Sequence, residues 1–311
     1  RYSPRRGDTD VIRVTMDENI QFGMPGAGNY TERPQYSADM IHQEAMAWLD
    51  LQTADTPFYG FFTYTLPHAE LCQPNDSIVE AYKYQFCDDI THNAEVGNYY
   101  HSVDACHTQF AGMITRLDFF VGEVLAKLKE KGLDDNTIVI FSSDNGPHEE
   151  GGADPTFFNR DGKLQGLKRS CHEGGIRIPF IVRWPGHIAP EQTSDHMLAF
   201  YDIMPTFMDL AGIGDQFPEG IKKSTTDVFD GISFAPTLLG NNSAQQEHDA
   251  LYWEFHETKQ VGVRKGDWKL VMKNNTYYLY NLAEDVHEDH DVKAQYPEKL
   301  AELKAVIKRE H

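Results

Sequence analysis

Two side chains that can bind a metal ion follow a mostly apolar stretch near the middle of the chain. Residues 137–141 (Thr-Ile-Val-Ile-Phe) are rich in β-branched side chains, which is typical of a strand buried on both faces of a parallel sheet. The stretch is followed by Asp144 and Asn145 and then by a Gly-Pro turn signal. Carboxylate and amide oxygens are ligands that Ca²⁺ prefers. In open α/β sheets ligands bind beyond the carboxyl ends of strands, so we expect a metal site here.

A long polar loop with a candidate anion-binding lysine follows the turn. Lys168 stands five residues before Glu173, and residues 180–184 form the next expected strand. A loop of this length inside a compact domain is usually functional or disordered. A lysine can bind an anion and stabilise negative charge in a transition state. The alternative is a solvated loop lysine, so the residue type alone does not assign the role.

A histidine closes a second expected strand. Residues 57–65 form a short aromatic run that ends at Leu-Pro and then His68. A histidine at the carboxyl end of a strand can donate a proton to a leaving group. The alternative is a histidine that is hydrogen-bonded near a turn.

Three further residues are candidates for binding substrate in the same pocket. His148 follows the metal turn, Arg160 lies in the polar loop, and His256 ends a strand in the C-terminal region. Arg177 is better explained by a salt bridge that holds the Gly-Gly turn at residues 174–175.

Helical periodicity predicts the elements that position these residues. The apolar residues of 36–51 and 104–131 recur at helical spacing, and Gly132 is a natural residue to end the second helix. A further helix is predicted over 197–211, where Pro205 either kinks it or marks its start.

The C-terminal region changes character. Four short apolar runs separated by turns predict an antiparallel meander, and a final helix follows over 297–309. The four expected strands are residues 251–255, 260–264, 268–272 and 277–280. We place a domain boundary near residue 240, which gives a larger α/β domain over 1–240 and a small domain over 241–311.

Composition limits the classes of partner. The chain has 311 residues with 28 basic and 48 acidic side chains, a formal net charge of −20. Such a surface repels nucleic acid and anionic membranes, so we expect neither as a partner, and any anion site must be locally positive. No apolar run approaches the ~20 residues that span a bilayer. Four cysteines permit two disulfides without requiring them, and buried free thiols are our default.

Together these motifs resemble the sulfatase family of the alkaline-phosphatase-like superfamily. The matching pieces are Ser-Asp-Asn-Gly-Pro-His at 143–148, Lys168 with Glu-Gly-Gly-Ile-Arg-Ile-Pro at 173–179, Trp-Pro-Gly at 184–186, and Pro67-His68. The resemblance extends from about residue 36 to about residue 298. It implies an α/β fold with a mostly parallel sheet flanked by helices, and a small C-terminal antiparallel sheet with a helix.

The resemblance also implies roles for the candidates. Asp144 and Asn145 would bind a single Ca²⁺, Lys168 would bind the sulfate, and His68 would face the ester leaving group. The acid at Glu173 would be structural and hold its turn. The form of residues 151–159 is similar to that of bacterial sulfatases that act on carbohydrate.

The family's nucleophile is not found in this chain. The family uses a formylglycine made from Cys or Ser in a Cys/Ser-x-Pro/Ala-x-Arg motif, and an Asp-Asp pair from its first strand. The nearest match, Cys-Gln-Pro-Asn-Asp at residues 72–76, has Asp76 where Arg is required. We therefore expect the chain to be the later part of a longer sulfatase, truncated at its N-terminus, with the formylglycine upstream and little hydrolytic activity in the chain alone.

The predicted reaction of the parent protein is hydrolysis of a sulfate monoester, of carbohydrate or of an aryl alcohol, to an alcohol and inorganic sulfate. One alternative is a phosphomonoester or phosphonate hydrolase of the same superfamily, which would need more metal ligands. The other is a protein that binds sulfated glycans without cleaving them. The resemblance implies a periplasmic or secreted location, and the oligomeric state is left open.

Overall fold

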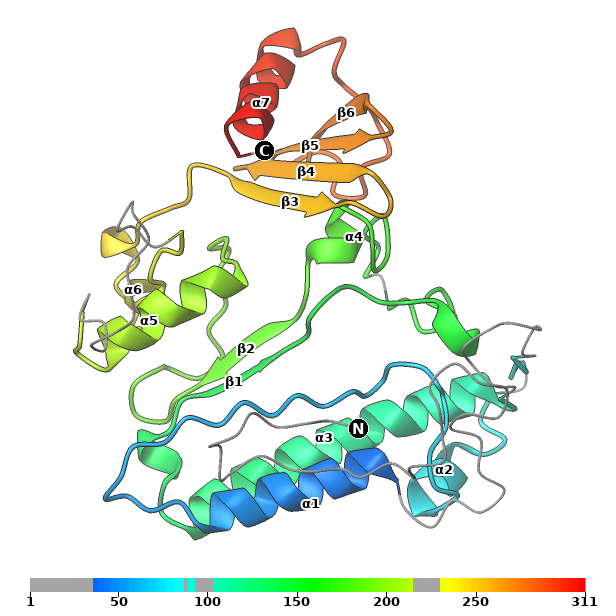
Figure 1. The fold of residues 1–311 in the computed structure, drawn as a ribbon, viewed down its shortest axis with the longest axis vertical. Coiled ribbons are helices and arrows are strands. Elements are labelled where there is room, and N and C mark those ends of the chain that lie inside the picture. The colour runs from blue at the N-terminus through cyan, green and yellow to red at the C-terminus, as the bar shows by residue number, and fades with distance from the viewer. Residues whose placement is uncertain (1–35, 87–88, 93–102, 161, 215–229, 311) are drawn as a thin grey trace. The chain divides into compact units, whose positions relative to one another are not determined.

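A computed structural model describes residues 36–86, 89–92, 103–160, 162–214 and 230–310 (Figure 1). The contacts of the chain divide it into two compact units. The first unit is Arg1–Thr137 with His148–Arg160, and the second is Ile138–Pro147 with Asp161–His311. Neither unit is a single continuous stretch, because the chain enters the second unit twice. The domain boundary expected near residue 240 stays a prediction.

Two long helices and one short helix form the first unit. They are α1 (Ser37–Asp50), α2 (Ser77–Tyr82) and α3 (Cys106–Glu130), followed by a 3₁₀ turn, η1 (Asp134–Asn136). Both expected long helices are confirmed, and Gly132 follows α3 in a left-handed conformation with φ 67°. Leu71, Phe110, Met113 and Phe120 form the centre of the apolar core. The side chain of Asp76 accepts hydrogen bonds from the first turn of α2.

The aromatic run expected as a strand over 57–65 is not one, and this prediction was wrong. The run is extended, but no described residue pairs with it in a ladder, and Tyr59 and Phe61 are 67% and 76% exposed. A strand needs a partner for its main-chain groups, which the described residues do not offer. Tyr64 instead fixes the end of the run, because its hydroxyl lies 2.7 Å from Nδ1 of His42, whose Nε2 lies 3.0 Å from Glu123.

The second unit contains a two-stranded sheet of β1 (Val139–Ser142) and β2 (Phe180–Arg183). The strands are antiparallel and pair Ser142 with Phe180. We expected the first of them to be buried on both faces in a parallel sheet, but its residues are half-buried and its described neighbour runs the opposite way. Because the two strands are antiparallel, the segment between them begins and ends at the same end of this sheet.

Short helices follow β2. A 3₁₀ turn, η3 (Phe200–Asp202), leads into α5 (Ile203–Leu210), and Pro205 lies in the first turn of α5, where its missing N–H has no helical partner to lose. The helix predicted over 197–211 is thus confirmed in its second part. The remaining short helices of this unit are α4 (Glu173–Ile176), α6 (Ala235–Leu238) and η4 (Asn242–Ala244).

The C-terminal sheet follows the prediction closely. Its strands are β3 (Leu251–Phe255), β4 (Gln260–Lys265), β5 (Trp268–Lys273) and β6 (Thr276–Asn281), antiparallel and in sequence order. Helix α7 (Pro297–Glu310) packs on β4 and β5. The core between them includes four side chains with no exposed surface, namely Val263, Leu270, Leu279 and Leu303.

Two further features concern the chain as a whole. None of the described helices has both the length and the apolar composition to cross a membrane. Cys106 and Cys171 are buried free thiols, and Cys87 lies outside the described residues.

Candidate functional site

The predicted metal ligands lie on the turn directly after β1. Asp144 is exposed, and its carboxylate forms no hydrogen bond or ion pair with the residues that the structure describes. The side-chain nitrogen of Asn145 donates to the carbonyl of Gly146 at 2.9 Å. Because the nitrogen is engaged in this way, the side-chain oxygen of Asn145 is the atom left to accept or to bind a cation. The two residues therefore offer oxygen ligands of the kind that Ca²⁺ takes.

The loop that carries Lys168 is fastened to this turn by main-chain hydrogen bonds. The amide of Lys168 donates to the carbonyl of Pro147 at 2.8 Å, and the amide of Gly146 donates to the carbonyl of Gly175 at 3.0 Å. The approach is so close that a Cβ at position 146 would lie 1.9 Å from the carbonyl oxygen of Gly174. Only glycine fits at this position. The structure thus brings Lys168 beside Asp144 and Asn145, although the loop between them is long.

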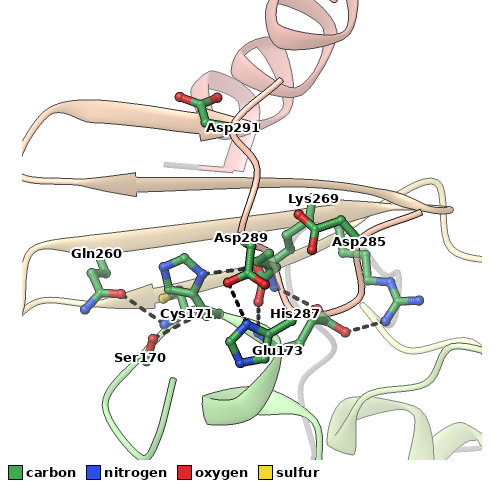
Figure 2. A network of polar contacts seen from close by, with 12 residues as sticks. Ser170, Cys171, Glu173, Gln260, Lys269, Asp285, His287, Asp289 and Asp291 are labelled. Atoms are coloured by element: carbon green, nitrogen blue, oxygen red, sulfur yellow. Dashed lines mark hydrogen bonds and ion pairs between the residues drawn. The ribbon is translucent and has the colours of Figure 1, made fainter. Parts of the chain in front are cut away.

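Glu173 is fully enclosed and paired with two cations from the C-terminal sheet (Figure 2). Nζ of Lys269 donates to one carboxylate oxygen at 3.0 Å, and Nη1 of Arg264 donates to the other at 2.7 Å. Burial works to raise the pKa of Glu173, but the charges of Lys269 and Arg264 outweigh it and hold the pKa below its ordinary value. Glu173 is therefore an ionised structural anchor, as expected, and not a general base.

A second buried carboxylate, that of Glu288, contacts the start of helix α4 and the residue before it. Glu288 accepts a hydrogen bond from the amide of Glu173 at 2.8 Å. Its other oxygen lies 3.2 Å from Nδ1 of His172, as a charge contact and not as an aligned hydrogen bond. Next to them, the amide of Cys171 donates to the side chain of Gln260 at 3.2 Å. The salt bridge that we expected from Arg177 is made by other residues, and Arg177 contributes its amide, which donates to the carbonyl of Glu173 at 2.7 Å.

In the first unit, His68 stacks on His148, with ring centroids 5.2 Å apart and ring planes 18° from parallel. Nδ1 of His68 lies 2.8 Å from the carbonyl oxygen of Ala69. A carbonyl can only accept, so Nδ1 carries the hydrogen in this contact. Nε2 faces Glu150, with 3.7 Å to its carboxylate. Nε2 is therefore the atom of His68 through which a proton can be gained or given.

His148 is buried and uses both ring nitrogens for structure. Nε2 donates to the carbonyl of Pro67 at 3.2 Å, and Nδ1 accepts from the amide of Glu150 at 3.2 Å. This pattern requires the neutral ring, and burial lowers the pKa of His148 below its ordinary 6.5. His148 thus connects the segment of His68 with the turn that carries Glu150.

Arg160 contacts the same region as the stacked rings of His68 and His148. Its guanidinium donates to the carbonyls of His148 at 2.9 Å and Asp154 at 3.3 Å, and lies 4.2 Å from the ring centre of Phe110. Burial lowers the pKa of Arg160 to about 10. These are scaffold contacts, and the substrate-binding role predicted for Arg160 remains a prediction.

His256 lies at the end of β3, with its side chain 89% exposed and Nδ1 3.3 Å from Glu254. The hairpin that follows does reach the Lys168 loop, because the hydroxyl of Thr258 donates to the carbonyl of Arg169 at 3.2 Å. No described contact joins His256 itself to that loop. Its predicted role as a substrate-binding residue also remains a prediction.

The predicted residues thus fall into two groups. His68, His148 and Arg160 lie together in the first unit, while the metal turn and Lys168 lie together in the second. Among the described residues no three or more His, Cys, Asp or Glu side chains form a cluster that could hold a metal ion. The assignment of Asp144 and Asn145 as metal ligands therefore stays a prediction.

Sequence reasoning missed two residues that support the site, Lys269 and Glu288. Lys269 carried a signal, because alternation along β5 places it on the same face as Val271, which has no exposed surface. A lysine at an inward-facing position in a strand needs a buried acid as partner. Glu288 lies in a turn-rich acidic segment whose sequence gives no comparable signal.

Comparisons with known proteins identify the family of the chain. The chain matches the Sulfatase family model over residues 8–213 and the model of the N-sulphoglucosamine sulphohydrolase C-terminal region over residues 166–310. An N-acetylgalactosamine-6-O-sulfatase of Bacteroides thetaiotaomicron is 30% identical over 233 residues, which are 65% of this chain and 43% of that protein. The uncharacterized sulfatase YdeN of Escherichia coli K12 is 27% identical over 312 residues, 88% of this chain and 50% of its own.

Solved structures give the same result for the fold. The crystal structure of Ps i-CgsB superposes with a TM-score of 0.69 at 26% identity and covers 88% of this chain and 55% of that chain. A second structure of that protein, in complex with k-i-k-neocarrahexaose, gives a TM-score of 0.68 at 26% identity. The chain spans about half the length of the relatives that it matches. The expected fold class is confirmed at this level, and the chain belongs to the sulfatase family.

Proposed function

We propose that the protein to which this chain belongs hydrolyses sulfate monoesters of carbohydrates to an alcohol and inorganic sulfate. The observation that carries the proposal is the fastening of the Lys168 loop onto the Asp144–Asn145 turn by the amides of Gly146 and Lys168. This arrangement supports the proposal, because it joins the main chain of Lys168 to the turn that carries the two candidate metal ligands. The named activities of the relatives, among them an endo-4-O-sulfatase and an ulvan-active sulfatase, support the same substrate class.

Asp144 and Asn145 would hold a Ca²⁺ ion in this proposal. The carboxylate of Asp144, which has no partner among the described residues, and the side-chain oxygen of Asn145 fit a hard cation. A bound Ca²⁺ supplies positive charge that neutralises the oxygens of a sulfate group. Lys168 would bind the same group from the loop and stabilise the charge that develops on it. The formylglycine expected as the nucleophile has no counterpart among the residues of this chain.

His68 would act on the leaving oxygen. Its Nδ1 is fixed by the carbonyl of Ala69, so Nε2 is the atom that can deliver a proton. The carboxylate of Glu150 lies 3.7 Å from this Nε2. His148, which stacks on His68, keeps the ring in place, and His148, Arg160 and His256 are retained as candidate substrate-binding residues. The substrate class further supports a periplasmic or secreted location, because sulfated polymers lie outside the cell.

The test uses the natural full-length protein with Lys168→Ala, assayed on N-acetylgalactosamine 6-sulfate, an aryl sulfate and the matching phosphate ester. We expect kcat/KM for sulfate esters to fall on the order of 100-fold to 1000-fold, as when one charge-stabilising group is removed from other active sites. Lys308→Ala, an exposed lysine on α7, is the matched control and should leave the rate unchanged. Preferential cleavage of the phosphate ester, or full activity without Lys168, would refute the proposal.

A further inference from the structure

The C-terminal sheet reaches the Lys168 loop through one buried lysine. Lys269 comes from the middle of the four-stranded sheet, has no exposed surface, and ends 3.0 Å from Glu173, the first residue of α4 (Figure 2). Its ammonium also lies 4.7 Å from the ring centre of Trp253. The sheet thus presents a positive charge to a loop that belongs to a different part of the sequence.

The two residues after Glu173 connect it to the start of the loop and to the metal turn. The amide of Gly174 donates to the carbonyl of Gln165 at 2.7 Å, which ties the start of the loop to its end. The carbonyl of Gly175 accepts a hydrogen bond from the amide of Gly146 in the metal turn. The amide of Lys168 donates to the carbonyl of Pro147 in the same turn. The path from the ammonium of Lys269 to the candidate metal ligands therefore runs through one side chain and two main-chain hydrogen bonds.

The charge of Lys269 is not needed to build the sheet. Val271, which lies on the same face of β5, is apolar and fully buried, and an apolar side chain at 269 would pack in the same layer. Replacing a buried ion pair by apolar residues is often neutral or stabilising, whereas removing one partner leaves a buried charge uncompensated. The pair of Lys269 and Glu173 therefore acts on the position of the loop more than on the stability of the sheet.

We propose that Lys269 is a positioning residue that fixes, through Glu173, the Gly174–Gly175 turn and with it the placement of Lys168 beside Asp144 and Asn145. Arg264 and Glu288 hold the same turn from other sides. The inference rests on the proposed function only for its effect on sulfate esters, because the placement of the loop can be measured without turnover.

The test is hydrogen exchange of main-chain amides in the 311-residue chain carrying Lys269→Met. We expect the amides of Gly146 and Lys168 to exchange on the order of 10-fold to 100-fold faster, because Glu173 loses one of its two cations and the loop opens more often. The control is Lys265→Met, which removes a lysine of β4 whose partners Asp249 and Glu302 are exposed. It should leave both amides unchanged.

A double variant, Glu173→Gln with Lys269→Met, separates positioning from stability and covers the case in which Lys269→Met does not fold. It removes both buried charges, so we expect the unfolding midpoint in urea to return toward that of the wild type. The amides of Gly146 and Lys168 should still exchange faster than in the wild type, because the contact between sheet and loop is missing. Arg264→Met, which leaves Lys269 in place, should give a smaller effect in the same direction.

The proposal is wrong if Lys269→Met or the double variant speeds exchange in β4 and β5 while Gly146 and Lys168 keep their wild-type rates. That result would make Lys269 part of the sheet only, and would leave the sulfatase proposal standing. Conversely, full activity of the natural protein with Lys168→Ala would remove the role of Lys168 and leave the coupling between Lys269 and the loop intact.

Discussion

The two regions that carry the predicted site residues are held by different kinds of contact. In the second unit the turn and the loop are joined directly by main-chain hydrogen bonds from the amides of Gly146 and Lys168, and the carboxylate of Asp144 takes no part. The side chains of Lys269 and Arg264 anchor this loop only at Glu173, away from the turn. In the first unit the side chains of His148 and Arg160 make the structural hydrogen bonds, by donating to carbonyls. Where main-chain hydrogen bonds hold a motif together, its polar side chains remain available for chemistry. Where side chains make the structural hydrogen bonds, those side chains are no longer available.

The sharpest way to break the main-chain arrangement is Gly146→Ala. The added Cβ would meet the carbonyl of Gly174 at 1.9 Å, and a main-chain atom cannot rotate away. We expect the free energy of unfolding to fall by about 3 kcal/mol or more, at the upper end of the usual cost of overpacking. Urea unfolding followed by circular dichroism measures it.

Gly122→Ala is the matched control for this substitution. Gly122 lies exposed in α3 with no atom within 4 Å of the added Cβ, so alanine there should stabilise the helix by roughly 0.5–1 kcal/mol. If both alanines changed stability by similar amounts, the close approach of turn and loop would not exist in solution.

The side-chain arrangement in the first unit is probed by Arg160→Met. Methionine keeps much of the apolar stem but loses the donors to His148 and Asp154 and the charge over Phe110. Hydrogen bonds from a charged group are each worth roughly 1.5–3 kcal/mol, so we expect a loss of about 2 kcal/mol in urea unfolding. Lys83→Met, which removes an exposed pair with Glu80, should leave the unfolding midpoint nearly unchanged. Equal effects of the two substitutions would argue against a scaffold role for Arg160.

The smallest expected effect is a difference in pH dependence between the regions. Burial lowers the pKa of His148 from its ordinary 6.5, so the unfolded chain takes up this proton before the folded one. Stability from His148 is therefore present above about pH 6.5 and is lost as the pH falls toward the folded pKa. Glu173, whose pKa is lowered from 4.5, gives stability above about pH 4.5 that is lost only below it.

Thermal unfolding between pH 7.5 and 3.5 tests this difference, with hydrogen exchange to assign each loss to a unit. His148→Asn should remove the loss that begins below about pH 6.5 and keep the acidic one. A variant that still loses stability in the upper window would show that another group titrates there.

Helices and strands with strong hydrophobic periodicity could be predicted from the sequence. Features that depend on which other segment a strand pairs with could not. Helix α3 and strands β3 to β6 were expected nearly residue for residue, because helical stripes and alternation are local properties. The pairing direction of β1 with β2, and the absence of a ladder between residues 57–65 and any other described segment, depend on which segment lies alongside. That information is not contained in the composition of either segment.

The candidate site shows the same division. The association of Asp144 and Asn145 with Lys168 was predicted from motif order, and the contacts through Gly146 and Pro147 explain it physically. The buried role of His148 was not predicted, because its position next to the metal turn pointed to the pocket. Only the fold shows that its two nitrogens are already engaged.

The interleaved course of the chain limits how it can be divided. The chain passes from the first unit into the second at Ile138, returns at His148 and leaves again at Asp161. No single peptide-bond cleavage separates the units, and a piece covering only residues 166–310, the extent of the second family match, would lack β1. A protease that cut at residue 161 would leave β1 covalently attached to one fragment while its hydrogen-bonded partner stayed on the other. The two fragments would remain associated until denatured, so nicking and dissociation would be separate events.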